Sequence, residues 1–356
     1  MSIINKKKYD FYIKLLTVLF FIFINFVYFY LNLSTNLNDK VYSFQELFIN
    51  YQAGFIRRGL LGELSWILYH QYSIEPKFFF SILFFVIYLT QFFLFFYLAN
   101  KYIVSKIIFV LIFLSPALLL FHIYNPDLFF LRDSIIKLGL LLHAVIFYKY
   151  SYIDNNNKLY FKILKFLVVP IIFILNLIHE YQSFSISIHF LISLGAIQNT
   201  KQIKKLVLCY LPLIFSIILI MIFLGNKAQF YELSNLLLKF DIKLNPYLGG
   251  GLYSYVGGFY KWHFFYFSYR DFVNLFFSFI LSVLVFFVLF KILIKKKILS
   301  FHSKFQKKYF VYFIPTLIPF LLATDHGRSL SFISFYLTVF YMLLKLDKTL
   351  LIKKKI

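Results

Sequence analysis

The chain has 356 residues, of which 61% are hydrophobic and 14% charged. This balance excludes a soluble globular protein, since such proteins are about 45–50% apolar and about 25% charged. The net charge of +23 comes from lysine clusters at the ends of apolar segments, which indicates membrane topology and no nucleic-acid partner, and the single Cys209 excludes a disulfide framework.

The apolar segments predict an all-α fold, a polytopic transmembrane helical bundle of about ten spans. It forms a single integral membrane domain over residues 1–356. The first span follows three lysines without a small-residue cleavage site, so it is expected to be an uncleaved signal-anchor. The predicted spans are 11–32, 78–99, 107–124, 134–148, 163–179, 182–198, 206–224, 272–294, 309–323 and 329–345.

The lysine clusters fall on one face of the bilayer when these spans are threaded in order. The positive-inside rule makes this face cytoplasmic and places both termini there. Two medium-length segments, 33–77 and 225–271, then face the opposite, outer side. Every arginine falls on the outer side, and so does every acidic residue except Asp10, Asp154 and Asp347.

The first outer segment contains the sequence GFIRRGLLGEL, in which Arg57 and Arg58 stand between glycines. Glycines allow tight turns and close backbone approach. The segment is amphipathic, which predicts an interfacial or re-entrant helix before the second span. A guanidinium binds phosphate bidentately where lysine cannot, so the pair is either a phosphate clamp or an anchor to lipid headgroups.

Two similar stretches, FFLRDSI and FSYRDFV, each open a span that runs inward from the outer side. Asp133 and Asp271 stand where an N-cap is expected, directly after Arg132 and Arg270. Arg328 also precedes an inward span. Because helix N-termini favour anions, these arginines predict anion sites, with an interfacial Arg–Asp pair as the alternative.

Two short polar motifs supply candidate acids and bases. NLIHEYQSF places His179 and Glu180 at the outer end of a span, and TDHGR places Asp325 and His326 in a turn between two spans. Ionisable residues at such depth are candidate general bases, although helix-end pairs that bond neighbouring backbone are the alternative. The first motif is not the zinc-binding HExxH, because Ser183 replaces the second histidine, so no metal site is predicted.

The second outer segment contains NPYLGGGLYSYVGGFYKWHFFYFSYR. Flexible backbone interleaved with aromatic rings suits stacking on sugar rings, and an interfacial aromatic belt is the alternative. The candidate stacking residues are Tyr247, Tyr253, Tyr255 and Trp262. These features together predict a substrate carried on a polyprenyl lipid, whose tail stays in the membrane. The arginines would bind its phosphate or pyrophosphate, a carboxylate would act as the base, and the aromatic rings would hold its glycan.

With its GFIRRGLLG, HE and DHGR motifs, the whole chain resembles bacterial O-antigen and polysaccharide polymerases of the Wzy type. The resemblance implies an inner-membrane enzyme that joins undecaprenyl-pyrophosphate-linked repeat units at the periplasmic face. It implies metal-independent glycosyl transfer without a cofactor, with a chain-length regulator protein as a partner. The pyrophosphate ligands would be Arg57, Arg58, Arg132, Arg270 and Arg328, and the base would be Glu180 or Asp325, assisted by His179 or His326.

Two other functions fit the same features. A glycosyltransferase of the GT-C type uses a polyprenyl-phosphate sugar and often places an acid in its first outer loop, where Asp39 and Glu46 are available. A transporter or flippase for lipid-linked glycans places ionisable residues near the bilayer midplane. Here the span interiors are almost uncharged, with Lys14, Lys137 and His143 as exceptions.

Overall fold

The computed structural model describes residues 3–34, 42–56, 58–102, 106–115, 118–124, 129–197, 200–223, 225–238, 315, 328, 331–340 and 342–343. These residues are helical or irregular and include no strand, which confirms the all-α prediction for this part of the chain. Within these residues, five helices are long and apolar enough to cross a membrane: Phe11–Ser34, Pro76–Lys101, Asp133–Ile153, Asn157–Ile178 and Gln202–Ile222. The predicted spans 272–294 and 309–323 lie outside the described residues.

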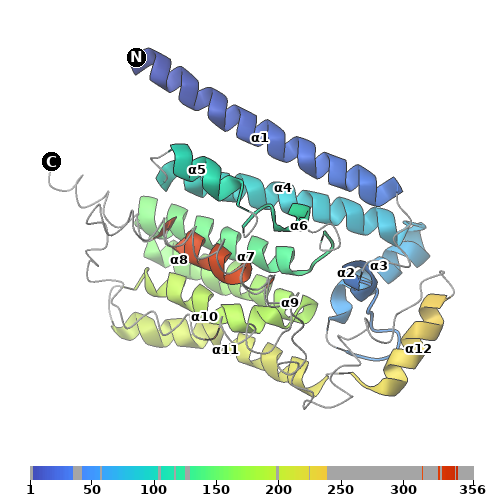
Figure 1. Ribbon diagram of the computed structural model, residues 1–356. Coiled ribbons are helices and arrows are strands. Elements are labelled where there is room, and N and C mark those ends of the chain that lie inside the picture. The colour runs from blue at the N-terminus through green and yellow to red at the C-terminus, as the bar shows by residue number, and fades with distance from the viewer. Residues whose placement is uncertain are drawn as a thin grey trace, which may run out of the picture.

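Helices α1 (Ile3–Ser34) and α4 (Pro76–Tyr102) form an antiparallel hairpin along one side of the bundle (Figure 1). The first outer segment folds between them into α2 (Tyr42–Glu46) and α3 (Gly59–Tyr72), so a helix is present where an interfacial or re-entrant helix was expected. Figure 1 shows α2, α3 and α12 (Lys227–Leu238) gathered at the end of the bundle opposite the start of α1.

The prediction of one continuous span at 107–124 is wrong. The chain there forms α5 (Lys106–Phe113) and a separate α6 (Phe121–Tyr124), with a turn at Leu118–Leu120 between them. Pro116 stands in this interval of the sequence, and proline both lacks the N–H that a helix needs and disfavours helical backbone before it.

The centre of the bundle consists of α7 (Asp133–Ile146) and its continuation η2 (Phe147–Ile153), followed by α8 (Asn157–Ile163), η3 (Leu164–Val168) and α9 (Val169–Ile178). The last three, α8, η3 and α9, form one continuous helix from Asn157 to Ile178, which begins earlier than the predicted span 163–179. Two further helices return across the bundle, α10 (Tyr181–Leu194) and α11 (Thr200–Ile222).

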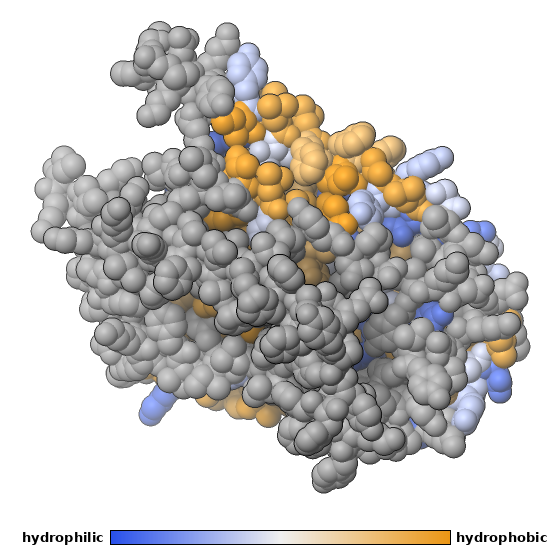
Figure 2. Space-filling view, in the orientation of Figure 1, coloured by the Kyte–Doolittle hydropathy of each residue, from blue (hydrophilic) through white to orange (hydrophobic). Residues whose placement is uncertain are grey.

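The outer surfaces of the long helices are apolar. Helix α1 exposes Phe11, Leu16, Phe23 and Tyr30, each more than 60% accessible, and Figure 2 shows its hydrophobic side chains along one edge of the molecule. Exposed aromatic and aliphatic side chains over the length of a span are what a lipid-facing surface requires. The chain is therefore a membrane-embedded protein.

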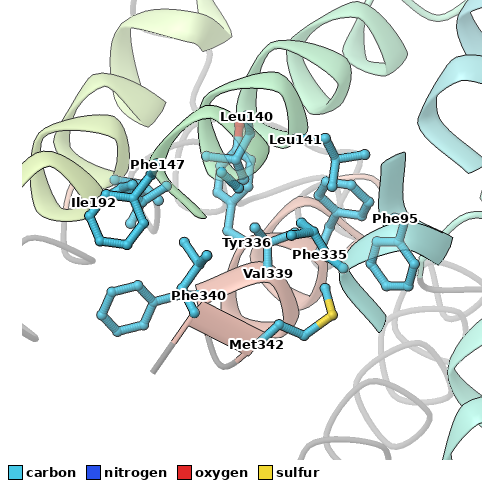
Figure 3. Close-up of a cluster of buried hydrophobic side chains, with 14 of the residues drawn as sticks. Phe95, Leu140, Leu141, Phe147, Ile192, Phe335, Tyr336, Val339, Phe340 and Met342 are labelled. Atoms are coloured by element: carbon cyan, nitrogen blue, oxygen red, sulfur yellow. The ribbon is translucent and has the colours of Figure 1, made fainter. Parts of the chain in front are cut away.

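A helix near the C-terminus, Ser331–Phe340, packs into the centre of the bundle. Figure 3 shows its Phe335 and Val339 among side chains of α7 and Phe95 of α4. The rings of Phe95 and Phe335 stack with centroids 5.8 Å apart. This packing fixes the position of the helix, and with it the position of Arg328 just before it.

Gly62 allows α3 to contact the backbone of the preceding segment. A Cβ atom at Gly62 would lie 2.0 Å from the carbonyl oxygen of Ile49, a backbone atom that side-chain rotation cannot move. At Gly139 the nearest atom is a side-chain carbon of Leu175, at 2.3 Å. The close approach expected from the glycines of this segment is thus present.

We expect Gly62→Ala to lower the free energy of unfolding by about 1–3 kcal/mol, since overpacking forces the backbone apart. Gly139→Ala is the matched control and should cost less, because the Leu175 side chain can rotate away. Titration with sodium dodecyl sulfate in mixed micelles measures both. Equal stability of Gly62→Ala and the unmodified chain would contradict this packing.

Candidate functional site

Charged side chains from distant parts of the sequence meet at the end of the bundle where α2 and α3 lie. Each is joined to the next by an ion pair or a hydrogen bond, and we call this set the ionic chain. It comprises, in order of contact, Arg132, Glu46, Arg58, Glu180, His179, Asp133 and Arg328. Arg58, Arg132, His179, Glu180 and Arg328 were all predicted as site residues from the sequence.

Arg58 joins the two glutamates of the ionic chain. Its Nε and Nη2 donate to the two carboxylate oxygens of Glu180, with an Nε–Oε2 distance of 2.6 Å, and its Nη1 donates to Glu46 Oε1 at 2.7 Å. Arg58 itself has φ of 65°, a left-handed conformation that costs a non-glycine residue about 1–2 kcal/mol. Strain of this kind concentrates at functional sites, where surrounding contacts enforce it.

Arg132 lies beneath Arg58 and is only 2% exposed. Its Nη2 donates to both the carboxylate and the backbone carbonyl of Glu46, at 3.1 and 2.8 Å. Its Nη1 donates to the carbonyl oxygens of Arg58 and Ile178, at 3.3 and 3.4 Å. Arg132 therefore binds together the ends of α2 and α9 and the residue that precedes α3.

Asp133 was expected to cap α7, but the structure places it differently. Arg132 occupies the N-cap position without a side-chain cap, and Asp133 is the first residue of the helix. Its carboxylate accepts two hydrogen bonds from Arg328, with an Nη2–Oδ1 distance of 2.5 Å, and lies 3.2 Å from His179 Nε2. The pairing with Arg328 provides a stronger, charge-assisted interaction than a cap would.

His179 links the two halves of the ionic chain. Its Nδ1 lies 3.3 Å from Glu180 Oε2, and its Nε2 faces Asp133 and Arg328. Tyr181 stacks on the imidazole with ring centroids 4.9 Å apart, and the guanidinium of Arg328 lies 4.9 Å from the same tyrosine ring. Burial raises the pKa of the Tyr181 hydroxyl, so this tyrosine stays neutral and acts as an aromatic wall.

Exposure divides the ionic chain into a floor and a rim. The side chains of Glu46, Arg132, Asp133 and His179 are 1–6% exposed, whereas those of Arg58, Glu180 and Arg328 are 11–14% exposed. On the rim the Glu180 carboxylate lies beside the guanidinium of Arg58, and His179 links it to the guanidinium of Arg328. This arrangement can bind an anion and accept a proton at neighbouring points.

Asp133 and Lys137 were not predicted as site residues, and Glu46 was predicted only for the GT-C alternative. Lys137 lies one turn below Asp133, is buried, and donates a hydrogen bond of 2.7 Å to Ser331. The signal for Asp133 was its place beside Arg132, and the signal for Lys137 was its rarity within an apolar span. Nothing in the local sequence distinguished Glu46 from Asp39.

Other predicted site residues lie outside the described residues. They are Arg57, Arg270, Asp325, His326, Tyr247, Tyr253, Tyr255 and Trp262. Across the part of the chain that is described, no group of three histidine, cysteine or acidic side chains has the geometry to hold a metal ion.

Comparisons with protein-family models, with curated proteins and with solved structures gave no match to this chain.

Proposed function

We propose that the chain is a glycosyltransferase of the bacterial inner membrane that uses a sugar donor carried on a polyprenyl phosphate or pyrophosphate. The convergence of Arg58, Arg132 and Arg328 with three carboxylates at one end of the bundle is the observation that supports it most. The lysine distribution predicts that this end faces the periplasm. A lipid-linked donor presents its phosphate at this depth while its tail stays in the bilayer.

The rim of the ionic chain suits the chemistry of this transfer. Arg58 and Arg328 bind the phosphate oxygens, whose negative charge grows as the bond between phosphate oxygen and anomeric carbon breaks. Glu180 takes the proton from the acceptor hydroxyl, whose oxygen forms the new bond to the anomeric carbon. The lipid phosphate leaves with the electron pair of the broken bond.

Substrate binding also accounts for how Glu180 becomes available as a base. In the structure both of its oxygens accept hydrogen bonds from Arg58. A phosphate group competes for this guanidinium because its geometry matches the same planar fork. The carboxylate that it displaces loses a stabilising partner and becomes a better proton acceptor. Arg132, buried below, positions Glu46 and Arg58 and does not contact the donor.

Two kinds of glycosyltransferase fit this proposal. The resemblance of the whole chain favours an O-antigen polymerase of the Wzy type, with an undecaprenyl-pyrophosphate donor and acceptor. Glu46 favours a GT-C type enzyme instead, because an acid from the first outer segment lies within the site, in contact with Arg58 and Arg132. Transport is disfavoured because the ionic chain gathers at one end of the helices and not at their middle.

Deleting the gene and separating the surface glycan by size distinguishes these enzymes. A polymerase deletion removes the ladder of chain lengths and retains one repeat unit. A single-sugar transferase deletion leaves a glycan that lacks one sugar, which mass spectrometry of the released repeat unit detects. A glycan unchanged in both ladder and composition would contradict both versions of the proposal.

A further inference from the structure

A second polar region lies at the opposite end of the bundle from the ionic chain, where η2 turns into α8 and where α11 begins. It surrounds a cavity with a volume of about 1270 Å³. The cavity exceeds the roughly 300–1,000 Å³ of typical small-ligand pockets. We call it the basic pocket, and its lysines are Lys158, Lys162, Lys165 and Lys205.

Three of these lysines share one face of the continuous helix formed by α8, η3 and α9. Lys158, Lys162 and Lys165 stand four and three residues apart, a spacing that places side chains along one face of a helix. Lys205 faces them from the second turn of α11. Among the described residues Asp154 is the one acidic residue that lines the cavity, so four positive charges meet one negative charge from this part of the chain.

No ion pair between these lysines and a carboxylate is formed within the described ranges of the chain. Lys165 lies 5.1 Å from the ring of Phe166, and all four lysines are exposed. Clustered like charges repel one another, and an anion between them relieves that repulsion.

The walls of the basic pocket change from polar to apolar along the helices. Leu208 and Cys209 lie one turn beyond Lys205 along α11, and Phe166 directly follows Lys165. Leu208 and Phe166 are 62% and 66% exposed, although each belongs to a candidate membrane span. Such side chains face lipid tails, so the cavity opens toward the bilayer and not only toward water.

The geometry points to a binding site for an anionic phospholipid in the basic pocket, with its phosphate among the lysines and its acyl chains along Phe166 and Leu208. Basic pockets between spans on the cytoplasmic side suit such headgroups, and the lysine distribution predicts that this end is cytoplasmic. A soluble anion would find the same lysines but would leave the apolar wall uncovered.

The experiment uses the purified full-length chain in detergent and measures bound lipid by native mass spectrometry. Dioleoyl phosphatidylglycerol should bind more strongly than dioleoyl phosphatidylcholine. The variant Lys162→Gln/Lys205→Gln should weaken phosphatidylglycerol binding by about fivefold for each lysine removed. Lys149→Gln is the matched control, since Lys149 is exposed at the same end but does not line the pocket. Equal binding of both lipids, or an unaffected double variant, would overturn the proposal.

Cys209 provides a second readout, because it is the one cysteine of the chain and lines the basic pocket. Phosphatidylglycerol should slow its labelling by a maleimide severalfold, and phosphatidylcholine should not. Labelling that slows equally with inorganic pyrophosphate alone would show that the pocket takes a free anion and would contradict the lipid. If Cys209 is labelled at the same rate with and without phosphatidylglycerol, no lipid binds against the apolar side of the basic pocket, and the proposal is contradicted.

Discussion

Arg132→Met is expected to lower the free energy of unfolding by about 3–5 kcal/mol, because it removes a guanidinium that pairs with the buried Glu46 carboxylate. The same change removes donors from three backbone carbonyls, those of Glu46, Arg58 and Ile178. Titration with sodium dodecyl sulfate in mixed micelles measures the loss. Glycan transfer should fall with it, because the buried arginine positions the rim residue Arg58.

A double-mutant cycle separates this pairing from a general loss of packing. Glu46→Gln removes the charge that Arg132 balances, so Arg132→Met should cost less in a Glu46→Gln background than in the unmodified chain. Coupling of about 0.5–3 kcal/mol is expected for groups in direct contact. If the stability losses of Arg132→Met and Glu46→Gln simply add in the double variant, Arg132 stabilises the fold through its aliphatic stem and not through Glu46.

Glu180→Gln is expected to reduce glycosyl transfer by about 10²–10⁴-fold, the range that a positioned general base contributes. The substitution keeps the shape of the side chain and removes only its charge and its capacity to accept a proton. The glutamine can accept only one of the two hydrogen bonds from Arg58, but Arg58 keeps its bond to Glu46, so the loss of stability should be smaller than for Arg132→Met. Transfer from a polyprenyl-linked donor by the purified variant is the measurement.

Glu232→Gln is the matched control, because Glu232 is exposed on α12 and lies outside the ionic chain. It should transfer sugar at the unmodified rate. Full activity of Glu180→Gln would remove this residue from the mechanism and would leave the proton to another group. An equal loss in both variants would mean that the effect comes from surface charge and not from the site.

The helices were predictable because the apolar runs are long, and a run of about 20 residues has few alternatives to a span. The break between α5 and α6 was missed, although Pro116 stood in the sequence, because hydropathy does not respond to a lost hydrogen-bond donor. The helix that ends in α9 begins at Asn157, six residues before the predicted span 163–179. The lysines at its start were assigned to a loop, but the helix continues through them.

Arg58, Arg132 and Arg328 were predictable as site residues because arginine is rare in this chain and concentrated on one side. His179 and Glu180 were predictable because ionisable residues at the end of a span are candidates for function. Their pairings were not. Arg58 and Glu180 are 122 positions apart, and Asp133 and Arg328 are 195 apart. Neither separation follows from a helical or turn repeat, so only the packing of the helices determines which carboxylate meets which arginine. The position of Glu46 on the floor depends in the same way on how α2 packs against the residues just before α7.

The wide spacing of the ionic chain has a consequence for how the protein is made. Asp133 and Lys137 enter the nascent bundle with α7, yet Arg328 and Ser331, which bond to them, are synthesised almost 200 residues later. Until then α7 holds a carboxylate and an amine whose late partners do not exist, a costly state within a bilayer. Docking of the Ser331–Phe340 helix ends that state. The site is therefore completed late in biogenesis, since a chain interrupted before Arg328 lacks the partners of Asp133 and Lys137.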